Sequence, residues 1–335
     1  MTDLSILDLS PINQGSTVAQ SLENSRRLAI KAESLGYRRF WLAEHHGMPG
    51  IASAATALVI QHVAAATTSI RVGSGGIMLP NHSPLVIAEQ FGTLEALFPG
   101  RIDLGLGRAP GTDMKTARAL RRNLDAAAES FPQDVVELMR LLGPADAAGG
   151  AGVLAVPGAG AKVPVWLLGS SHYSAHLAGI LGLPFAFASH FAPDMLLSAL
   201  EIYRERFEPS AVLDKPHVMV GAMAVAADSA DDAAHHFTSM QQSFLRLRRG
   251  TPGAFPPPVE SMDGHWNAQE RIMVEHTLQY AIVGDPGTVR RRLAEFQSLT
   301  GADEIILSMP VYDMDAKLRS LEIFAEARGT LRAAA

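Results

Sequence analysis

The sequence predicts an α/β fold in which eight parallel strands close into a (β/α)8 barrel of the TIM type. Two observations support this class. Short apolar segments alternate with helical segments through eight cycles, and these segments are rich in Ile, Leu, Val and Phe, as expected where helices cover a parallel sheet. The 335 residues are 47% hydrophobic, which is enough for a large core. We therefore expect residues 1–335 to form a single barrel domain, because α/β barrels often exceed the average domain size.

Turn-forming residues separate the predicted strands. These strands are Leu4–Leu9, Arg39–Ala43, Ile70–Ile77, Arg101–Leu106, Val163–Leu168, Phe185–Ala188, His217–Ala227 and Glu304–Met309. A doubly wound open sheet remains the alternative architecture, because the order of the strands cannot be derived from the sequence alone.

Apolar periodicity and capping residues predict the helices between these strands. One begins near Thr17, which can cap it with Gln20 three residues on, and Gly36 suits the left-handed position that ends it. Asp285 is suited to cap a helix that begins at Pro286. The other predicted helices are Ala52–Ala66, Pro84–Phe98, Leu120–Leu142, Ser174–Leu181, Pro193–Phe207, Ser229–Arg248 and Met314–Arg328.

Two segments interrupt the alternation. Pro144–Ala161 is rich in alanine and glycine and is interpreted as a surface loop. Arg249–Asp263 contains three consecutive prolines, which neither a helix nor a central strand accommodates. A long irregular segment in a compact domain is usually functional or disordered. We expect an insertion loop here, between strand seven and the final helices.

The composition excludes several kinds of site. The chain has no cysteine, so disulfides, thiolate metal sites and cysteine nucleophiles are excluded. Its net charge is −6, with acidic and basic residues interspersed, so we expect no nucleic-acid partner. We find neither a signal peptide nor an uninterrupted apolar stretch of membrane-spanning length. The sequence therefore predicts a cytoplasmic protein that does not cross a membrane.

Polar residues follow the second predicted strand directly, as Glu44, His45 and His46. The active site of a parallel barrel lies at the carboxyl ends of its strands. Neighbouring residues on a strand point to opposite faces, so the two histidines would not easily chelate one metal ion. The helical zinc motif HExxH is also absent. We expect no metal here and interpret the segment as functional rather than structural.

Glycines and an arginine follow the third and fourth predicted strands. Gly75 and Gly76 would let a ligand approach the backbone closely, although relief of crowding in the barrel explains them equally well. The segment Gly105–Gly111 is only a partial dinucleotide-binding motif, because its third glycine is displaced. Arg108 is a fixed cation after a strand and suits a phosphate, with a surface ion pair as the alternative.

A serine cluster follows the fifth predicted strand. Ser170 and Ser171 lie at a helix N-terminus, where hydroxyls and free backbone N–H groups form an anion site. Plain capping is the alternative, but it needs only one serine. Because Arg108 follows the neighbouring strand, the two segments together predict a phosphate pocket. The pair His235 and His236 is interpreted as part of an exposed helix surface.

These segments resemble the bacterial luciferase-like flavin monooxygenases over nearly the whole chain. Residues 43–46, 79–84 and 100–108 match motifs typical of that family. The resemblance implies that His45 is catalytic and that Glu44 orients or stabilises the pair.

The same resemblance implies a phosphate site made by Arg108 with Ser170, Ser171 and Ser174, although bacterial luciferase has an acidic residue in place of Ser170. The family often has a non-proline cis peptide after strand three, for which Gly75-Gly76 is the best candidate. Arg249–Asp263 is similar to the family's mobile active-site loop. Ser189-His190-Phe191 is similar to a segment of small single-subunit members.

The activity implied by the resemblance is that of an FMN-dependent monooxygenase. It would receive reduced FMN from a separate flavin reductase, use O2 to oxygenate a small organic substrate, and form a homodimer. Two alternatives remain: a deazaflavin-dependent oxidoreductase that transfers hydride, and a non-catalytic flavin-binding protein, which would be expected to have lost the pair Glu44 and His45. A sugar-processing barrel would need two carboxylates at strand ends, and only Glu44 is a strong candidate.

Overall fold

The computed structural model of the chain describes residues 2–109, 114–120, 129–144 and 152–331. Within these ranges, all strands but one form a closed parallel barrel in the order β1-β2-β3-β4-β5-β6-β7-β9, and β9 pairs with β1. The barrel strands are β1 Asp3–Asp8, β2 Arg39–Leu42, β3 Arg71–Met78, β4 Ile102–Gly107, β5 Val165–Gly169, β6 Phe185–Phe187, β7 Val218–Ala226 and β9 Glu304–Ser308. The short β8, Ile282–Gly284, pairs only with the end of β7. The predicted barrel is confirmed, and the open sheet is excluded by its closure.

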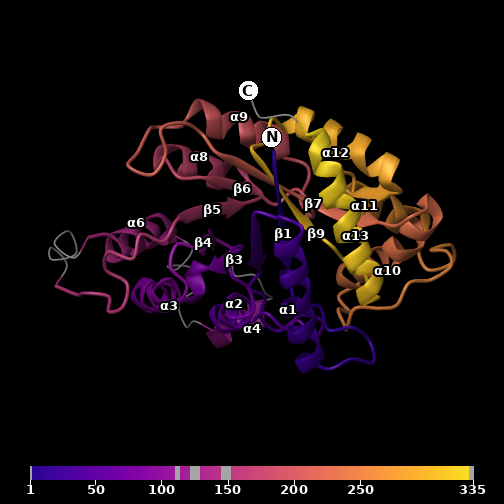
Figure 1. Cartoon of the computed structure of the whole chain (residues 1–335), viewed down its shortest axis with the longest axis horizontal. Helices are drawn as coiled ribbons and strands as arrows, with labels where there is room; N and C mark the ends of the chain where they lie inside the picture. The colour runs from indigo at the N-terminus through magenta and orange to yellow at the C-terminus, as the bar shows by residue number, and fades with distance from the viewer. Residues whose placement is uncertain (1, 110–113, 121–128, 145–151, 332–335) are drawn as a thin grey trace.

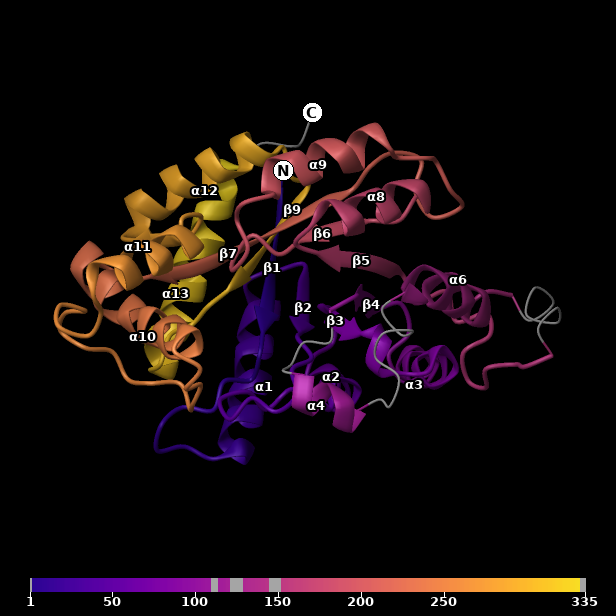
Figure 2. The same cartoon turned by 180° about the vertical axis from the view of Figure 1, so that it is seen from behind.

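The helices lie around the outside of these strands (Figures 1 and 2). The first half of the chain contributes α1 Val18–Ser34, α2 Thr56–Ala64, α3 Pro84–Leu97, α4 Met114–Leu120 and α6 Phe131–Leu142, with the 3-10 helix η1 Leu79–Asn81 after β3. The second half contributes α8 His172–Ile180, α9 Leu196–Glu205, α10 Ala230–Arg248, α11 Ala268–Thr277, α12 Pro286–Thr300, α13 Met314–Ala327 and the 3-10 helix η2 Arg328–Thr330. No helix in the described ranges combines the length and apolar character needed to cross a bilayer.

The strands are apolar on both faces because both faces are covered. Phe40 on β2 is fully buried toward the helices, whereas its neighbour Trp41 belongs to a separate cluster inside the barrel. There Trp41 meets Trp166 of β5 edge to face, with ring centroids 5.2 Å apart. Leu7, Met219 and Ile306 complete this interior layer. This pattern explains why the strands appear as nearly continuous apolar runs in the sequence.

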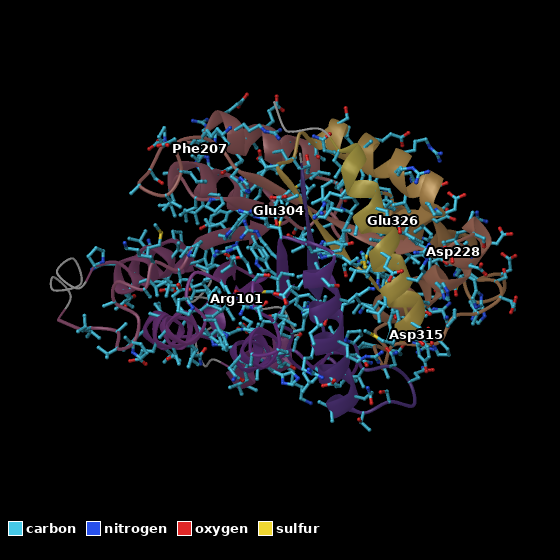
Figure 3. All side chains as sticks on the ribbon, in the orientation of Figure 1. Arg101, Phe207, Asp228, Glu304, Asp315 and Glu326 are labelled. Carbon is cyan, nitrogen blue, oxygen red and sulfur yellow. The ribbon has the colours of Figure 1, made fainter. Side chains whose placement is uncertain are left out.

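A buried ion-pair network fills the amino-terminal end of the barrel. The Arg39 guanidinium donates to Glu304 at 2.9 and 3.0 Å and to Asp103 at 2.7 Å. Arg71 donates to the other oxygen of Asp103 at 2.6 Å. Burial alone would raise the pKa of Glu304, but the charge of Arg39 and hydrogen bonds hold this pKa below its usual value. Figure 3 labels Glu304 near the middle of the molecule, whereas Asp315 lies on an outer helix.

The predicted helix ends agree with the structure where a capping residue marks them. Thr17 accepts the Gln20 N–H before α1, and Asp285 accepts the Thr288 N–H before α12. Gly36 follows α1 with φ of 76°, in the left-handed region. These local signals act through the backbone of neighbouring residues, so they can be recognised in the sequence.

Other helix predictions were wrong in extent. The helix predicted over Leu120–Leu142 is not continuous. Leu120 ends α4, and α6 begins at Phe131 after a break at Ser130, with Pro132 in the first turn, where its missing N–H is tolerated. Residues 121–128 lie outside the description. The helix predicted from Ala52 begins only at Thr56, because the Ser53 hydroxyl is held by the backbone oxygens of Leu9 and Ala43. The structure also contains α11 and β8, which were not predicted.

Candidate active site

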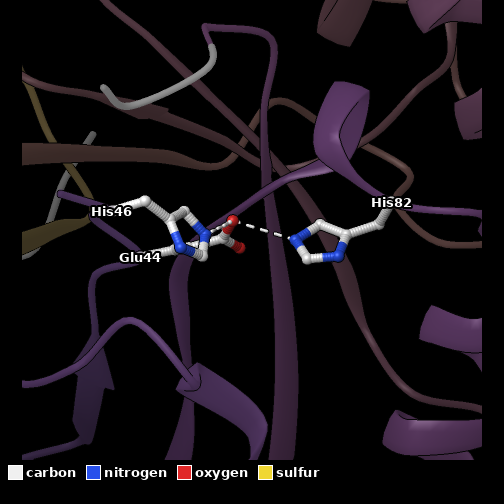
Figure 4. Close-up of side chains that lie close together, drawn as sticks. All are labelled: Glu44, His46 and His82. Atoms are coloured by element: carbon white, nitrogen blue, oxygen red, sulfur yellow. Dashed lines mark hydrogen bonds and ion pairs between the residues drawn. The ribbon is translucent and has the colours of Figure 1, made fainter. Parts of the chain in front are cut away.

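Glu44, just after β2, is the shared acceptor of two histidines. Its Oε1 accepts from His46 Nε2 at 2.7 Å and from His82 Nε2 at 2.9 Å (Figure 4). Its Oε2 accepts the backbone N–H of Met78 at 3.1 Å. Glu44 and His46 are two residues apart and meet on one side, while His82 comes from the turn that follows β3. We call Glu44, His46 and His82 the carboxylate triad.

The carboxylate of this triad is anionic. Burial alone would raise the pKa of Glu44, which is 1% exposed, but the hydrogen bonds from His82, His46 and Met78 hold the pKa below its usual value. Because a carboxylate only accepts, both imidazoles present a protonated Nε2 to it.

The composition of the triad also suits a divalent metal ion, since its three ligand atoms lie within 4.8 Å of one another. A tetrahedral zinc ion with bonds of about 2.0 Å would separate its ligand atoms by about 3.3 Å. The observed separations of 2.7 and 2.9 Å are those of direct hydrogen bonds. The sequence argument against a metal compared only His45 with His46 and did not include His82. The absence of a metal therefore stays a prediction.

His45 lies outside the triad. It is partly buried, and its Nδ1 is buried with no hydrogen-bond partner among the described residues. Burial lowers the pKa of His45, Glu44 partly offsets this effect, and His46 adds to it. The His45 imidazole is therefore neutral at pH 7, and its Nδ1 has no hydrogen-bond partner among the described residues.

The glycines after the middle of β3 serve barrel packing. The peptide bond Gly75-Gly76 is cis, as the sequence analysis expected. A Cβ on Gly75 would lie 2.7 Å from Leu7 Cδ1, and one on Gly76 would lie 2.8 Å from the Gly105 oxygen. The backbone of Gly105 leaves no room for a side chain at position 76, whereas a side chain at position 75 would displace Leu7. Crowding in the barrel thus accounts for both glycines without a ligand, and their contact with a cofactor stays a prediction.

Arg108 reaches the helix that the serine cluster begins. The Arg108 guanidinium lies over the ring of Tyr173, 4.1 Å from its centroid, and Tyr173 is in the first turn of α8. Ser171 occupies the N-cap of α8, yet its side chain makes no capping bond. The first N–H groups of the helix are thus open to another acceptor. Ser170 precedes this cap.

Ser174 differs from the other two serines. It is 4% exposed, and a Cβ on Gly169 would lie 2.2 Å from its Oγ. The side chain therefore packs against the end of β5, and its proposed contact with a phosphate stays a prediction.

The predicted insertion loop is present and irregular. Phe255 is buried and pairs with the segment after β1, donating to the Ile12 oxygen and accepting the Gln14 N–H, each at 2.8 Å. The loop thus lies beside the carboxyl end of β1, and its mobility stays a prediction. The interpretation of His235 and His236 as exposed was wrong, because both are partly buried where α10 packs beside this loop through Thr238 and Val259.

Sequence reasoning missed three residues of this site. His82 stands in a motif that was recognised, but the motif gave no reason to pair it with Glu44. Tyr173 directly follows the serine pair, and an aromatic residue at this place is a signal for stacking with the neighbouring arginine. His190, after β6, was noted only for its likeness to family members.

Comparison with known proteins agrees with this arrangement. Residues 2–303 match the model of the luciferase-like monooxygenase family. The chain is 53% identical over 335 residues to a luciferase-like monooxygenase of Escherichia coli (strain K12), covering 99% of each chain. It is 35% identical over 254 residues to the N-acetyl-S-alkylcysteine monooxygenase of Bacillus subtilis (strain 168), covering 75% of each.

Solved structures show the same fold. The crystal structure of apo-MsnO8 has a TM-score of 0.87 and 32% identity, covering 98% of this chain and 99% of that one. Two more distant structures share the fold alone. One is the oxygenating constituent of 3,6-diketocamphane monooxygenase from Pseudomonas putida in complex with FMN (TM-score 0.74, 17% identity, all of both chains), and the other an F420-dependent secondary alcohol dehydrogenase (TM-score 0.71, 15% identity, 99% of each). With a family match over most of its length, the chain belongs to the luciferase-like monooxygenases.

Proposed function

We propose that this protein is an FMN-dependent monooxygenase that uses reduced FMN and O2 to oxygenate a small organic substrate. The observation that carries the proposal is Arg108 stacked on Tyr173 at the uncapped N-terminus of α8. A guanidinium, two serine hydroxyls and open backbone N–H groups are the donors that a phosphate dianion requires. FMN ends in such a phosphate, so the residues present fit this cofactor.

The proposed roles follow from this placement. Arg108, Ser170 and Ser171 hold the phosphate, with Ser174 one turn further along the helix, while Gly75 and Gly76 lie beside the ring system. Bound reduced FMN supplies the reaction with O2, and the protein supplies orientation and excludes water. His45 accepts or donates a proton, since its Nδ1 has no hydrogen-bond partner among the described residues. Glu44 keeps the loop after β2 in place through the carboxylate triad.

The wider setting rests on the family resemblance. We place the reduction of FMN on a separate flavin reductase that supplies the reduced cofactor transiently. Residues 1–335 act as one barrel domain, and a homodimer in the cytoplasm is the proposed working form.

Cofactor identity is tested by anaerobic titration of the purified protein with FMN, reduced FMN, riboflavin and F420. We expect FMN to bind at least about 10-fold more tightly than riboflavin, because riboflavin lacks the phosphate and its charge-assisted hydrogen bonds. An F420-dependent enzyme is the second candidate, since a solved protein of the same fold is one. Binding of F420 without measurable binding of FMN would establish that alternative.

Oxygenation is tested with reduced FMN and 18O2 on a panel of aldehydes, amines, sulfonates and thioethers. The panel includes an N-acetyl-S-alkylcysteine, because a relative is a monooxygenase of that compound. One labelled oxygen atom in a product, detected by mass spectrometry, is the expected result. Tight FMN binding without label in any product would favour a flavin-binding protein instead.

A further inference from the structure

His190 lies across the barrel from His45. It follows β6, and three strands separate β6 from β2 in each direction around the ring. Both histidines come just after the carboxyl ends of their strands, where the candidate active site lies. The two rings therefore approach the same end of the barrel from opposite walls.

The backbone around His190 is held in place, and the neighbouring strand β7 leaves room for its ring. The Ser189 hydroxyl donates to the Gly221 oxygen at 2.6 Å, and Phe191 meets the His190 ring edge to face with centroids 4.8 Å apart. Gly221 is the only glycine of β7, and a Cβ there would lie 2.3 Å from His190 Nδ1. The space that a side chain at position 221 would fill is thus taken by the His190 imidazole.

The ring nitrogens of His190 and His45 have similar surroundings. In both rings Nδ1 is buried with no partner among the described residues, while Nε2 remains accessible. His46 and His82 differ, because each already donates to Glu44. Nδ1 of His190 meets neither a donor nor an acceptor among the described residues. We therefore expect the neutral tautomer with the proton on Nε2, which leaves no buried N–H without an acceptor. Neither His45 nor His190 is used in a structural hydrogen bond, which is unusual for buried polar groups.

The two rings also influence each other electrostatically. Burial, and then the charge of a protonated His45, lowers the pKa of His190 to about 4. Glu44 partly restores the pKa of His45, whereas no carboxylate in the described chain has this effect on His190. His45 is thus the ring that takes up a proton first, and His190 stays neutral at physiological pH.

We infer that His190 is a second functional histidine of this site, which contacts the bound substrate through Nε2–H from the wall opposite His45. An uncharged donor suits a neutral acceptor, such as an amide, carbonyl or sulfinyl oxygen, better than a carboxylate. This role rests on the proposed function, because it concerns how the substrate of the oxygenation is oriented.

The first test does not depend on flavin. In 15N-histidine NMR spectra of the protein without cofactor, the His190 resonances, assigned with His190→Asn, should show a neutral Nε2–H tautomer at pH 6.5. In His45→Asn the pKa of His190 should rise, because a positive neighbour is removed. A charged His190 at pH 6.5, or a pKa that ignores His45→Asn, overturns the inference whatever the cofactor proves to be.

The second test separates the two nitrogens. His190→Gln retains a polar group near Nε2, His190→Asn one near Nδ1, and His190→Phe the ring without nitrogen. For the compound oxygenated in the 18O2 panel, kcat/KM should fall about 10-fold or more in His190→Phe and recover to within about 3-fold in His190→Gln, as expected for one hydrogen bond. The matched control is His62→Asn, an exposed histidine on α2.

Failure of this inference is distinguishable from failure of the proposed function. Wild-type protein that does not oxygenate any compound disproves the function, and the NMR result then decides the charge state of His190 by itself. If wild type oxygenates a compound and His190→Phe does so with the same kcat/KM, the function stands and the role of His190 is overturned. Gly221→Ala should reproduce the loss in His190→Phe. The control is Gly329→Ala in η2, where nothing lies within 4 Å of the added Cβ.

Discussion

Glu44 accepts from His46 and His82, and its proposed effect on the site can be separated from that of His45. In Glu44→Gln one acceptor oxygen becomes an NH2 group. Either the two histidines that share Oε1 or the Met78 N–H at Oε2 then loses its acceptor. Loss of a hydrogen bond to a charged group corresponds to about 10- to 100-fold in rate, so we expect kcat/KM to fall by that factor. The affinity for FMN, measured by fluorescence titration, should stay within about 3-fold.

The matched control for this change is Glu205→Gln, an exposed residue on α9. An unchanged kcat/KM in Glu44→Gln would mean that the triad serves only the fold. A large loss of FMN affinity would instead place Glu44 in contact with the cofactor.

The triad should need no metal. Because its ligand atoms are at hydrogen-bond distances, we expect purified protein to contain less than about 0.1 equivalent of zinc or iron by elemental analysis. Dialysis against EDTA should leave the oxygenation rate unchanged. Loss of activity in EDTA that zinc or iron restores would show that the cluster is a metal centre.

The depressed pKa of His190 predicts a pH dependence of stability. The neutral ring is favoured by folding, so its contribution is fully present above the ordinary pKa of 6.5 and is lost as the pH falls toward about 4. The shift corresponds to at most about 3 kcal/mol of unfolding free energy. Urea unfolding between pH 7 and 4 should therefore show a shallower decline in His190→Asn than in wild type. Parallel curves would show that His190 is protonated as readily in the folded chain as in the unfolded one.

At the scale of elements, the proposed anion site joins the start of α8 to Arg108, just after β4. Tyr173→Leu removes the ring beneath the Arg108 guanidinium, and Arg108→Gln removes the charge. We expect either change to raise the dissociation constant of FMN by about 10-fold or more, as for the loss of a charge-assisted contact. The dissociation constant of riboflavin should change by less than about 2-fold, because it has no phosphate.

Arg291→Gln, a change to an exposed arginine on α12, is the control for charge alone. Equal losses for FMN and riboflavin would place Arg108 beside the ring system rather than the phosphate.

The same scale shows what the sequence can and cannot predict. The barrel strands are recognisable because helices cover their outer face and an apolar layer fills the interior, so each is apolar throughout. The closeness of Arg108 to the start of α8 is predictable because Arg108 and Ser171 follow neighbouring strands of a parallel sheet. The helix α11 was missed, although Asn267 and Glu270 form a capping box, because only two of its residues are buried and its apolar period is weak.

Contacts that depend on tertiary structure were beyond this reasoning. His82 reaches Glu44 only because the turn after β3 folds back beside the loop after β2. The His190 ring packs against Gly221, which is 31 positions away in the sequence and lies on the next strand. Neither pairing has a local signal in the sequence.

Across the whole molecule, the two ends of the barrel have different polar contents. The amino-terminal end contains the buried ion pairs of Arg39, Asp103 and Glu304. The carboxyl end contains His45, His46, His82 and His190. The apolar layer of Trp41 and Trp166 lies in the same interior. Because the ion pairs begin the strands and the histidines follow them, changes at one end should not reach the other.

This separation predicts that the ion-pair network affects stability but not the site. In Glu304→Gln, Arg39 stays buried with only part of its counter-charge, so we expect a loss of about 3–5 kcal/mol in unfolding free energy by urea denaturation. The FMN dissociation constant, measured where the variant is fully folded, should stay within about 3-fold. Arg319→Gln, which breaks an exposed pair with Asp228, should cost less than about 1 kcal/mol. A stable Glu304→Gln variant would mean that water or Asp103 alone satisfies Arg39, and a loss of FMN affinity would mean that the two ends of the barrel are coupled through its interior.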